Sequence, residues 1–311
     1  MIDHHIAMTG SKNFQLRKRR RSSEQLIELL VRFTGLLAIV VLLGVFFILL
    51  QQGIPALFET SPWEFLTGHL WQPYSEPPVL GISQFFISTL WVTAVSTILA
   101  VPVGVGAAVY LAEIAPQRVT DIVKPLVELL SGFPSVVMGF IGLALLSPWV
   151  QQTFNLNTGL TGFTAGIMLS MMSLPVIVSV SEDALRAVPD EFRQASYGLG
   201  ATKWETIWNV SLPVALSGVS AAIMLGVGRA IGETMTVLMV AGGAQAVPSS
   251  PFEPMMPMTA AIASGIGNAV VNGPQYHALF GIGLVLFILT FFVNYIAAHV
   301  LQAQKRKFAR S

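Results

Sequence analysis

Six apolar stretches, each longer than about 20 residues, constrain this chain more than any other feature. A membrane core about 30 Å thick needs about 20 apolar residues of helix, because an α-helix rises about 1.5 Å per residue. The 311 residues are 53% hydrophobic and only 11% charged, whereas soluble domains are about 25% charged. The sequence therefore predicts an all-α polytopic membrane protein with six transmembrane helices. The expected spans are 27–50, 85–112, 122–146, 159–180, 214–241 and 279–301.

Lysine and arginine residues are distributed unevenly around these spans. Sixteen of the seventeen lie in the tails, loops and span edges of one side, and the opposite loops 51–83, 147–158 and 242–276 contain none. Such a bias marks the cytoplasmic side. We therefore expect a cytoplasmic basic tail over 1–26, a transmembrane domain over 27–303 and a second cytoplasmic tail over 304–311. In front of a span, the basic run of the first tail indicates topology and membrane lipid contact rather than nucleic-acid binding.

The remaining basic residue, Arg229, lies inside the fifth predicted span, about 20 Å from its cytoplasmic end. Charges inside a membrane are costly, face the bundle interior and mark functional sites. A guanidinium binds tetrahedral oxyanions through two parallel hydrogen bonds, so Arg229 is a candidate for an anion pathway. The alternative is a structural ion pair with Glu233, one turn further on. Gly228 and Gly232 also form a G-x-x-x-G spacing that favours close helix packing.

A second candidate lies at Gly132-Phe133-Pro134-Ser135, which interrupts the third span. Proline frees a backbone carbonyl, and protein or water must satisfy it. Ser131 and Ser135 place two hydroxyls four residues apart, on one face of a helix, where they would line the pathway. A kink without any binding role is the alternative.

The segment 181–213 is a polar island between two apolar spans. Small residues at 195, 196, 198 and 200 allow a short helix and its turn to approach another protein closely, and Gly200 suits the turn. We expect a second helix to start near Lys203 and to be separated from the fifth span by Pro213. A hairpin packed only on itself is the alternative.

The island resembles the coupling loop of permeases from ATP-binding-cassette (ABC) importers, whose pattern is E-A-A-x3-G-x9-I-x-L-P. The chain has Gln194-Ala195-Ser196, then Gly200, Val210 and Leu212-Pro213 at the same spacings. Gln, Ser and Val replace Glu, the second Ala and Ile, so the carboxylate of the pattern is missing at 194. The resemblance implies a type I importer permease in which an ATPase contacts the loop. The implied coupling residues are Glu191, Gln194, Ala195, Ser196, Gly200, Leu212 and Pro213.

The segments 128–139 and 228–235 resemble permeases of the high-affinity phosphate (Pst) importers, and the long first outer loop is similar to that of the PstC-type subunit. The resemblance covers about 27–303. It implies a multi-pass protein of the bacterial inner membrane that transports inorganic phosphate. Its implied partners are a PstA-type second permease, a PstB-type ATPase dimer and an extracytoplasmic PstS-type binding protein. It also places Arg229 and Glu233 in the phosphate pathway.

The sequence contains no pattern that indicates catalysis, ATP binding or metal binding by this chain itself. It lacks the G-x-x-x-x-G-K-[ST] pattern of ATP-binding loops, has no cysteine, and scatters its five histidines without ligand spacing. We therefore expect a transport subunit without catalytic residues, metal or cofactor, driven by a partner's ATP hydrolysis. The alternatives are a permease for another oxyanion (sulfate, molybdate or phosphonate) and a phosphate-sensing subunit that does not transport.

Overall fold

The computed structural model describes the backbone of residues 22–308, so most of the two predicted tails, 1–26 and 304–311, lies outside the described residues. Within them, six helical segments are long and apolar enough to cross a membrane. The fold is thus the predicted six-span helical architecture, with one small pair of strands added. The six segments are Leu26–Glu59, Ser83–Ile114, Ser135–Thr153, Gly162–Arg186, Lys203–Gly232 and Pro274–Ile296.

The chain divides into two units at Phe47 and Ile48. The first unit holds the greater part of helix α1 (Ser22–Glu59), whose apolar side chains are exposed all around the helix. Such a surface suits lipid rather than water. Near its start Arg32 donates a 2.6 Å hydrogen bond to Glu28, one turn earlier.

The second unit begins with a segment that is more ordered than the predicted loop 51–83. Helix α1 continues to Glu59, helix α2 (Pro62–Thr67) follows, and strands β1 (Trp71–Gln72) and β2 (Val79–Leu80) pair antiparallel. Phe65 and Leu80 are fully buried there. The sequence pattern missed this because its prolines indicate turns without showing which apolar residues pack beneath them.

Helix α7 (Gly162–Arg186) forms the centre of the second unit and packs between α3 (Ser83–Val109) and α10 (Leu212–Gly232). Ile177 lies against glycines of both neighbours. A Cβ added at Gly104 or at Gly226 would come within 2.6 Å of the Ile177 side chain. The close packing of the three helices therefore depends on the absence of a side chain at Gly104 and Gly226.

The third span differs from the predicted 122–146. Residues Gln117–Ser131 form a separate amphipathic helix, α4, and the membrane-length segment runs through α5 (Ser135–Ile141), the π-helical turn η2 (Gly142–Leu146) and α6 (Ser147–Thr153). The charged residues of α4 make it a poor membrane helix, and Pro134 cannot continue it. The predicted outer loop 147–158 consequently starts as helix.

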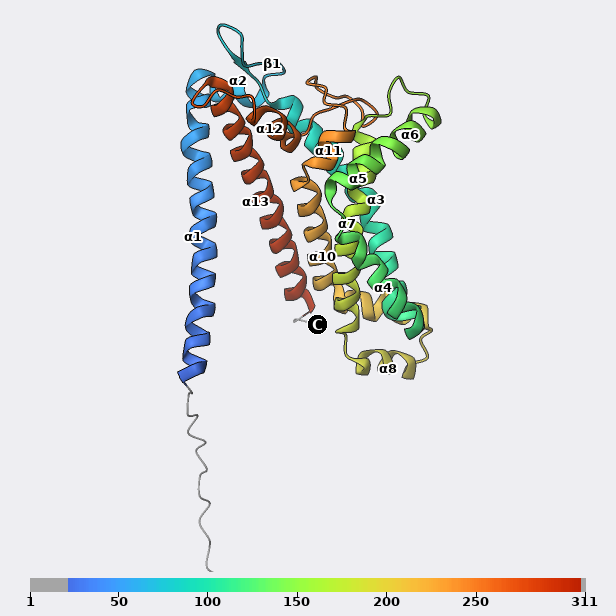
Figure 1. The fold of residues 1–311 in the computed structure, drawn as a ribbon. Helices are drawn as coiled ribbons and strands as arrows, with labels where there is room; N and C mark the ends of the chain where they lie inside the picture. Colours follow the sequence, from blue (N-terminus) through green and yellow to red (C-terminus); the bar gives the residue numbers. More distant parts are fainter. Residues whose placement is uncertain (1–21, 309–311) are drawn as a thin grey trace, which may run out of the picture. The chain divides into compact units, whose positions relative to one another are not determined.

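The later elements are also longer or shorter than predicted. The island 181–213 loses its first residues to α7, which ends at Arg186, and keeps helices α8 (Asp190–Gly198) and α9 (Lys203–Thr206). The predicted span 214–241 ends early, at Gly232, and is followed by α11 (Met235–Val240), α12 (Met258–Ile266) and α13 (Pro274–Phe308). In Figure 1, α8 lies at one end of α7, whereas α11, α12 and β1 lie at the other end.

Candidate functional sites

The fifth span is broken at Glu233. Helix α10 ends at Gly232, Glu233 is extended (φ −71°, ψ 134°), and α11 starts two residues later. The Glu233 carboxylate accepts hydrogen bonds from the backbone amides of Thr234 (3.1 Å) and Thr236 (3.4 Å), which have no partner inside the short helix. Glu233 therefore does not continue the face of α10 that carries Arg229, as the sequence had indicated, but caps the next helix.

Arg229 lies in the last turn of α10, half-buried, and has no hydrogen-bond or ion-pair partner among the residues whose side chains the structure describes, 26–296, 298 and 299. The predicted ion pair with Glu233 does not form. A guanidinium carries five N–H donors, and leaving them unpaired away from water is costly. Its partner must come from outside the described chain: water, another subunit or an anion.

The break at 132–134 lies close to the break at Glu233. The Thr236 hydroxyl donates a 2.9 Å hydrogen bond to the Ser135 carbonyl, so α11 is held against the start of α5. Thr259 also donates to the Glu233 carbonyl, at 2.8 Å. Three interrupted segments that are distant in sequence therefore meet beside the end of α10.

Ser131 does not share a face with Ser135, because the helix ends between them. Ser131 closes α4, is exposed, and donates to the Glu128 carbonyl at 2.6 Å. Ser135 is half-buried and opens α5. A small cavity of about 10 Å³, room for about one water, lies beside Glu233 and Thr259.

The island forms a helical hairpin that we call the coupling hairpin, residues 190–211. Gly200 has φ +87°, a conformation that favours glycine, and reverses the chain after α8. Thr202 and Glu205 form a reciprocal capping box that starts α9, and the Ser196 hydroxyl lies 2.9 Å from the Thr206 hydroxyl. The capping box therefore stabilises the start of α9, and the hydroxyl contact joins α8 to the end of α9.

The residues selected from the family pattern separate into two groups in this hairpin. Glu191, Gln194, Ala195 and Gly200 are exposed and available to a partner. Ser196, Leu212 and Pro213 are half-buried. The sequence expectation that Pro213 separates the hairpin from the fifth span is wrong, because α9, the π-helical turn η3 (Ile207–Ser211) and α10 form one continuous helical segment. The shifted register of η3 accommodates a proline that lacks an amide hydrogen.

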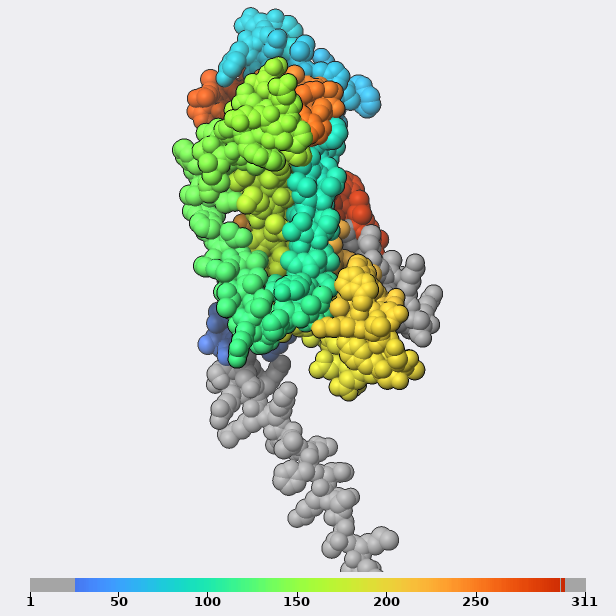
Figure 2. Space-filling model, turned by 90° about the vertical axis from the view of Figure 1, so that its right-hand side faces the viewer, coloured from blue at the N-terminus to red at the C-terminus, as the bar shows by residue number. Residues whose placement is uncertain are grey.

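Sequence reasoning missed the apolar surface of this hairpin. Leu199 is 90% exposed at its tip, and four aromatic side chains near it are also exposed. Figure 2 shows this segment, in yellow, standing out from the neighbouring surface. Exposed apolar groups on a polar segment mark an interaction site. The aromatic residues are Phe192, Tyr197, Trp204 and Trp208.

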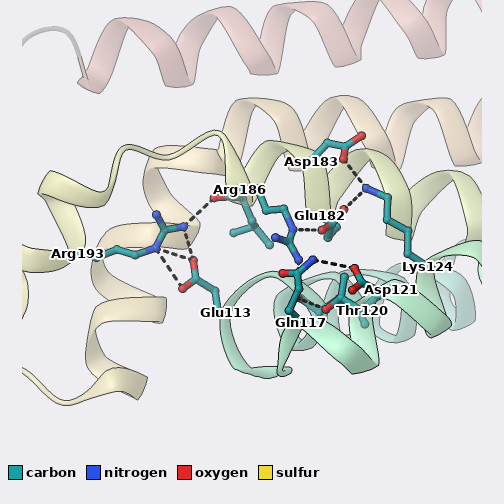
Figure 3. Close-up of polar contacts among 11 residues, drawn as sticks. Glu113, Gln117, Thr120, Asp121, Lys124, Glu182, Asp183, Arg186 and Arg193 are labelled. Atoms are coloured by element: carbon teal, nitrogen blue, oxygen red, sulfur yellow. Dashed lines mark hydrogen bonds and ion pairs between the residues drawn. The ribbon is translucent and has the colours of Figure 1, made fainter.

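A cluster of charged residues around the buried Glu182 was also missed (Figure 3). Glu182 of α7 is 1% exposed and pairs with Lys124 of α4 and Arg186 of α7. Lys124 also reaches Asp183 at 2.7 Å. Burial opposes the charge on Lys124, but its hydrogen bonds to Asp183 and Glu182 prevail and raise the pKa of the ammonium group. The only sequence signal was the acidic pair itself, since its basic partners are distant along the chain.

The second part of this cluster joins Arg193 of α8 to Glu113, in the π-helical turn η1 (Tyr110–Ile114) that ends the second span. The two closest atoms, Nη2 and Oε1, are 2.8 Å apart. Hydrogen bonding to Glu113 raises the pKa of the guanidinium despite its partial burial. Among the described residues, no group of histidine and carboxylate side chains could hold a metal ion.

Comparisons with known proteins agree with this architecture. The family model of binding-protein-dependent transport system inner membrane components matches residues 100–307. The probable ABC transporter permease YqgH of Bacillus subtilis is 37% identical over 84% of each chain. The phosphate transport system permease PstC of Mesorhizobium japonicum is 34% identical over 85% of each chain. PstC of Pasteurella multocida is 33% identical and covers 93% of this chain and 96% of its own.

Two solved transporters share the fold at low identity. An inward-facing MetNI methionine ABC transporter gives a TM-score of 0.57 at 20% identity, covering 74% of this chain and 99% of its own. A bacterial alginate ABC importer gives 0.57 at 14% identity, covering 89% and 98%. The chain therefore belongs to the binding-protein-dependent transport system inner membrane components, and it is a multi-pass membrane permease subunit of the ABC importer type.

Proposed function

We propose that this permease carries inorganic phosphate as the PstC-type subunit of an ATP-driven importer. The structural observation that carries the proposal is Arg229, a half-buried cation in the fifth span with no partner among the described residues. A transported oxyanion would supply the missing acceptor through charge-assisted hydrogen bonds. The choice of phosphate is supported by relatives named PstC, which are 33–34% identical over most of the chain.

In this proposal Glu233 shapes the pathway rather than neutralising Arg229. Its carboxylate holds the start of α11, and its carbonyl accepts from Thr259. The broken helix therefore keeps polar backbone groups near the cation, an arrangement tolerated in membranes only where protein or water lines it. Ser135 fixes the same region through its carbonyl, and Ser131 offers a hydroxyl at the far side of the break.

The proposed partners are those that the relatives named PstC imply, and the coupling hairpin offers a surface for one of them. A PstB-type ATPase dimer would contact the coupling hairpin through Leu199 and its exposed aromatic neighbours, on the cytoplasmic side. A PstA-type second permease would complete the pathway, and a PstS-type binding protein would deliver phosphate from the opposite side. ABC importer permeases act with an ATPase and a binding protein, and this chain would therefore rely on that ATPase for energy.

The test replaces Arg229 with glutamine in the complete complex, reconstituted in vesicles. Loss of a charge-assisted hydrogen bond worth about 1.5–3 kcal/mol should lower phosphate uptake at least about tenfold. Arg118→Gln, at an exposed arginine of α4, is the matched control and should leave uptake unchanged. Uptake that is equal in the Arg229→Gln and wild-type complexes would exclude the pathway role. Sulfate in place of phosphate should stimulate neither uptake nor ATP hydrolysis.

A further inference from the structure

Arg193 makes more polar contacts than any other side chain of the coupling hairpin. Its Nε and Nη2 atoms donate to the Glu113 carboxylate, with the shortest distance 2.8 Å. Nη2 also donates to the Leu185 carbonyl at 2.9 Å, and Nη1 donates to the Val188 carbonyl at 2.7 Å. A last contact joins Nη1 to Asp190 at 3.1 Å. All five N–H donors of the guanidinium are therefore engaged.

The burial of the pair separates it from an ordinary surface ion pair. The side chains of Arg193 and Glu113 are 14% and 5% exposed, whereas Asp190 is 83% exposed. Exposed ion pairs contribute little to the free energy of folding. Removing one partner of a buried pair is costly, because it leaves an uncompensated charge away from water. The planar guanidinium also fixes direction as well as distance, because its donors have a rigid geometry.

The way the chain joins the hairpin to the spans suggests what the Arg193–Glu113 pair does. The hairpin is covalently joined to α7 on one side and to α10 on the other, so those two helices follow its movement directly. Helix α3 has no such connection. Glu113 lies in η1, at the end of α3, and Arg193 lies in α8, eighty residues further along the chain (Figure 3). The pair is therefore a direct polar connection between the hairpin and the second span.

The two ends of this connection differ in their backbone structure. On the hairpin side Arg193 is held by the carbonyls of Leu185, in the last turn of α7, and of Val188, in the segment that links α7 to α8. On the span side Glu113 lies in a π-helical turn, a local widening of the helix that commonly marks functional sites. A displacement of α8 would therefore pass through a rigid guanidinium into a helix end that can rearrange.

We propose that Arg193 and Glu113 act as a positioning pair that transmits movement of the coupling hairpin to α3. This inference rests on the proposed function, since it takes the hairpin to be the contact for the ATPase. Neither residue contacts the transported anion. Without the pair, ATP hydrolysis would still move α7 and α10, but α3 would follow them only through its apolar packing against α7, and less phosphate would be transported per ATP consumed.

The first experiment measures phosphate taken up per ATP hydrolysed, for the complete complex in vesicles. Arg193→Gln and Glu113→Gln should each lower this ratio about fivefold or more, and the double variant should be no worse than either single one, because paired residues act as a unit. The KM for ATP and the co-purification of the subunits should stay unchanged. Asp190→Asn removes only the negative charge at the exposed contact of Arg193 and should leave the ratio as in the wild type.

A second experiment restores the connection covalently. The chain contains no cysteine, so Glu113→Cys and Arg193→Cys can be combined without background in this subunit. The double-cysteine complex, with cysteine-free partners, should be uncoupled. A flexible bis-methanethiosulfonate reagent that bridges the two side chains should recover coupling, and a monofunctional reagent should not.

The outcomes separate this inference from the proposed function. A wild-type complex that shows no phosphate-dependent ATP hydrolysis would overturn the proposed function. A wild-type complex that is coupled, together with Arg193→Gln and Glu113→Gln complexes that are equally coupled, would overturn the transmission role alone. Additive losses in the double variant, or recovery with the monofunctional reagent, would do the same.

Discussion

Two arginines show how differently one residue type is used in this permease. Arg193, outside the membrane spans, has all its donors occupied by protein groups. Arg229, inside a span, has none occupied by the described residues, although the cost of an unpaired charge is greater there. The contrast supports a transport role for Arg229 and a mechanical role for Arg193.

Glycines also divide into two kinds at the residue scale. A Cβ added at Gly104 or at Gly226 would lie 2.6 Å from a carbon of the Ile177 side chain, closer than two carbon atoms normally approach. A Cβ added at Gly228 or at Gly232 would have no described atom within 4 Å. The G-x-x-x-G spacing predicted from the sequence therefore does not pack against the described part of this chain. Both of its glycines lie near Arg229, on a helix that is free to approach another subunit there.

These glycines give a prediction for the stability of the isolated subunit. Gly104→Ala and Gly226→Ala should each lower the free energy of unfolding by about 1–3 kcal/mol, because the added methyl group overlaps Ile177. Gly228→Ala, a matched change in the same helix as Gly226, should be neutral or stabilise by up to about 1 kcal/mol. Thermal unfolding in detergent measures both. If Gly228→Ala lowered the free energy of unfolding as much as Gly226→Ala, the result would contradict the packing of these helices.

At the scale of elements, three helices that look continuous in sequence are interrupted or shifted. The third span breaks before Ser135, the fifth breaks at Glu233, and π-helical turns occur in the second, third and fifth spans. Breaks inside a membrane require polar partners, and here Thr236 and Thr259 provide them. Helices α11 and α12 lie at one end of α7, whereas the coupling hairpin lies at the other end (Figure 1).

The coupling hairpin gives a prediction for partner binding. Leu199→Ser should weaken ATPase binding about tenfold, since burial of a leucine is worth about 1.5–3 kcal/mol, while subunit stability stays unchanged. Leu70→Ser, at a leucine that is 60% exposed near the β-hairpin, is the control and should bind the ATPase normally. Binding is measured by titrating the ATPase onto the reconstituted permease. Substitution of Gly200 is less informative, because φ +87° would strain any other residue.

At the scale of the whole molecule, the remaining prediction concerns orientation. The basic-residue bias predicts that the coupling hairpin is cytoplasmic and the β-hairpin is on the opposite side. Single cysteines replacing Ser75 and Leu199 should therefore be labelled by a membrane-impermeant maleimide from opposite faces of an oriented membrane. Labelling of both positions from one face would contradict the topology.

Much of the architecture could be predicted from the sequence because membrane spans obey a local rule. An apolar run of sufficient length is readable without knowing its neighbours, and this gave the number of spans, although the third span lies at Ser135–Thr153 instead of 122–146 and the ends of the others shifted. The family motif at 194–213 was also readable, because spacing along a chain survives folding. Helix ends were less predictable. Gly232 is the last residue of α10 and Pro134 lies in the break before α5, but three other prolines lie inside helices without ending them: Pro102, Pro175 and Pro213.

The sequence by itself determined the class, the number of spans and the coupling hairpin, because hydrophobic length, charge bias and motif spacing are local properties. Only the tertiary structure decided which charges meet. It paired Glu113 with Arg193 and Glu182 with Lys124, and it left Arg229 without Glu233 as a partner. The physical reason is that a charge inside a membrane protein is governed by what lies within a few ångströms of it, and residues that are far apart in sequence supply those neighbours.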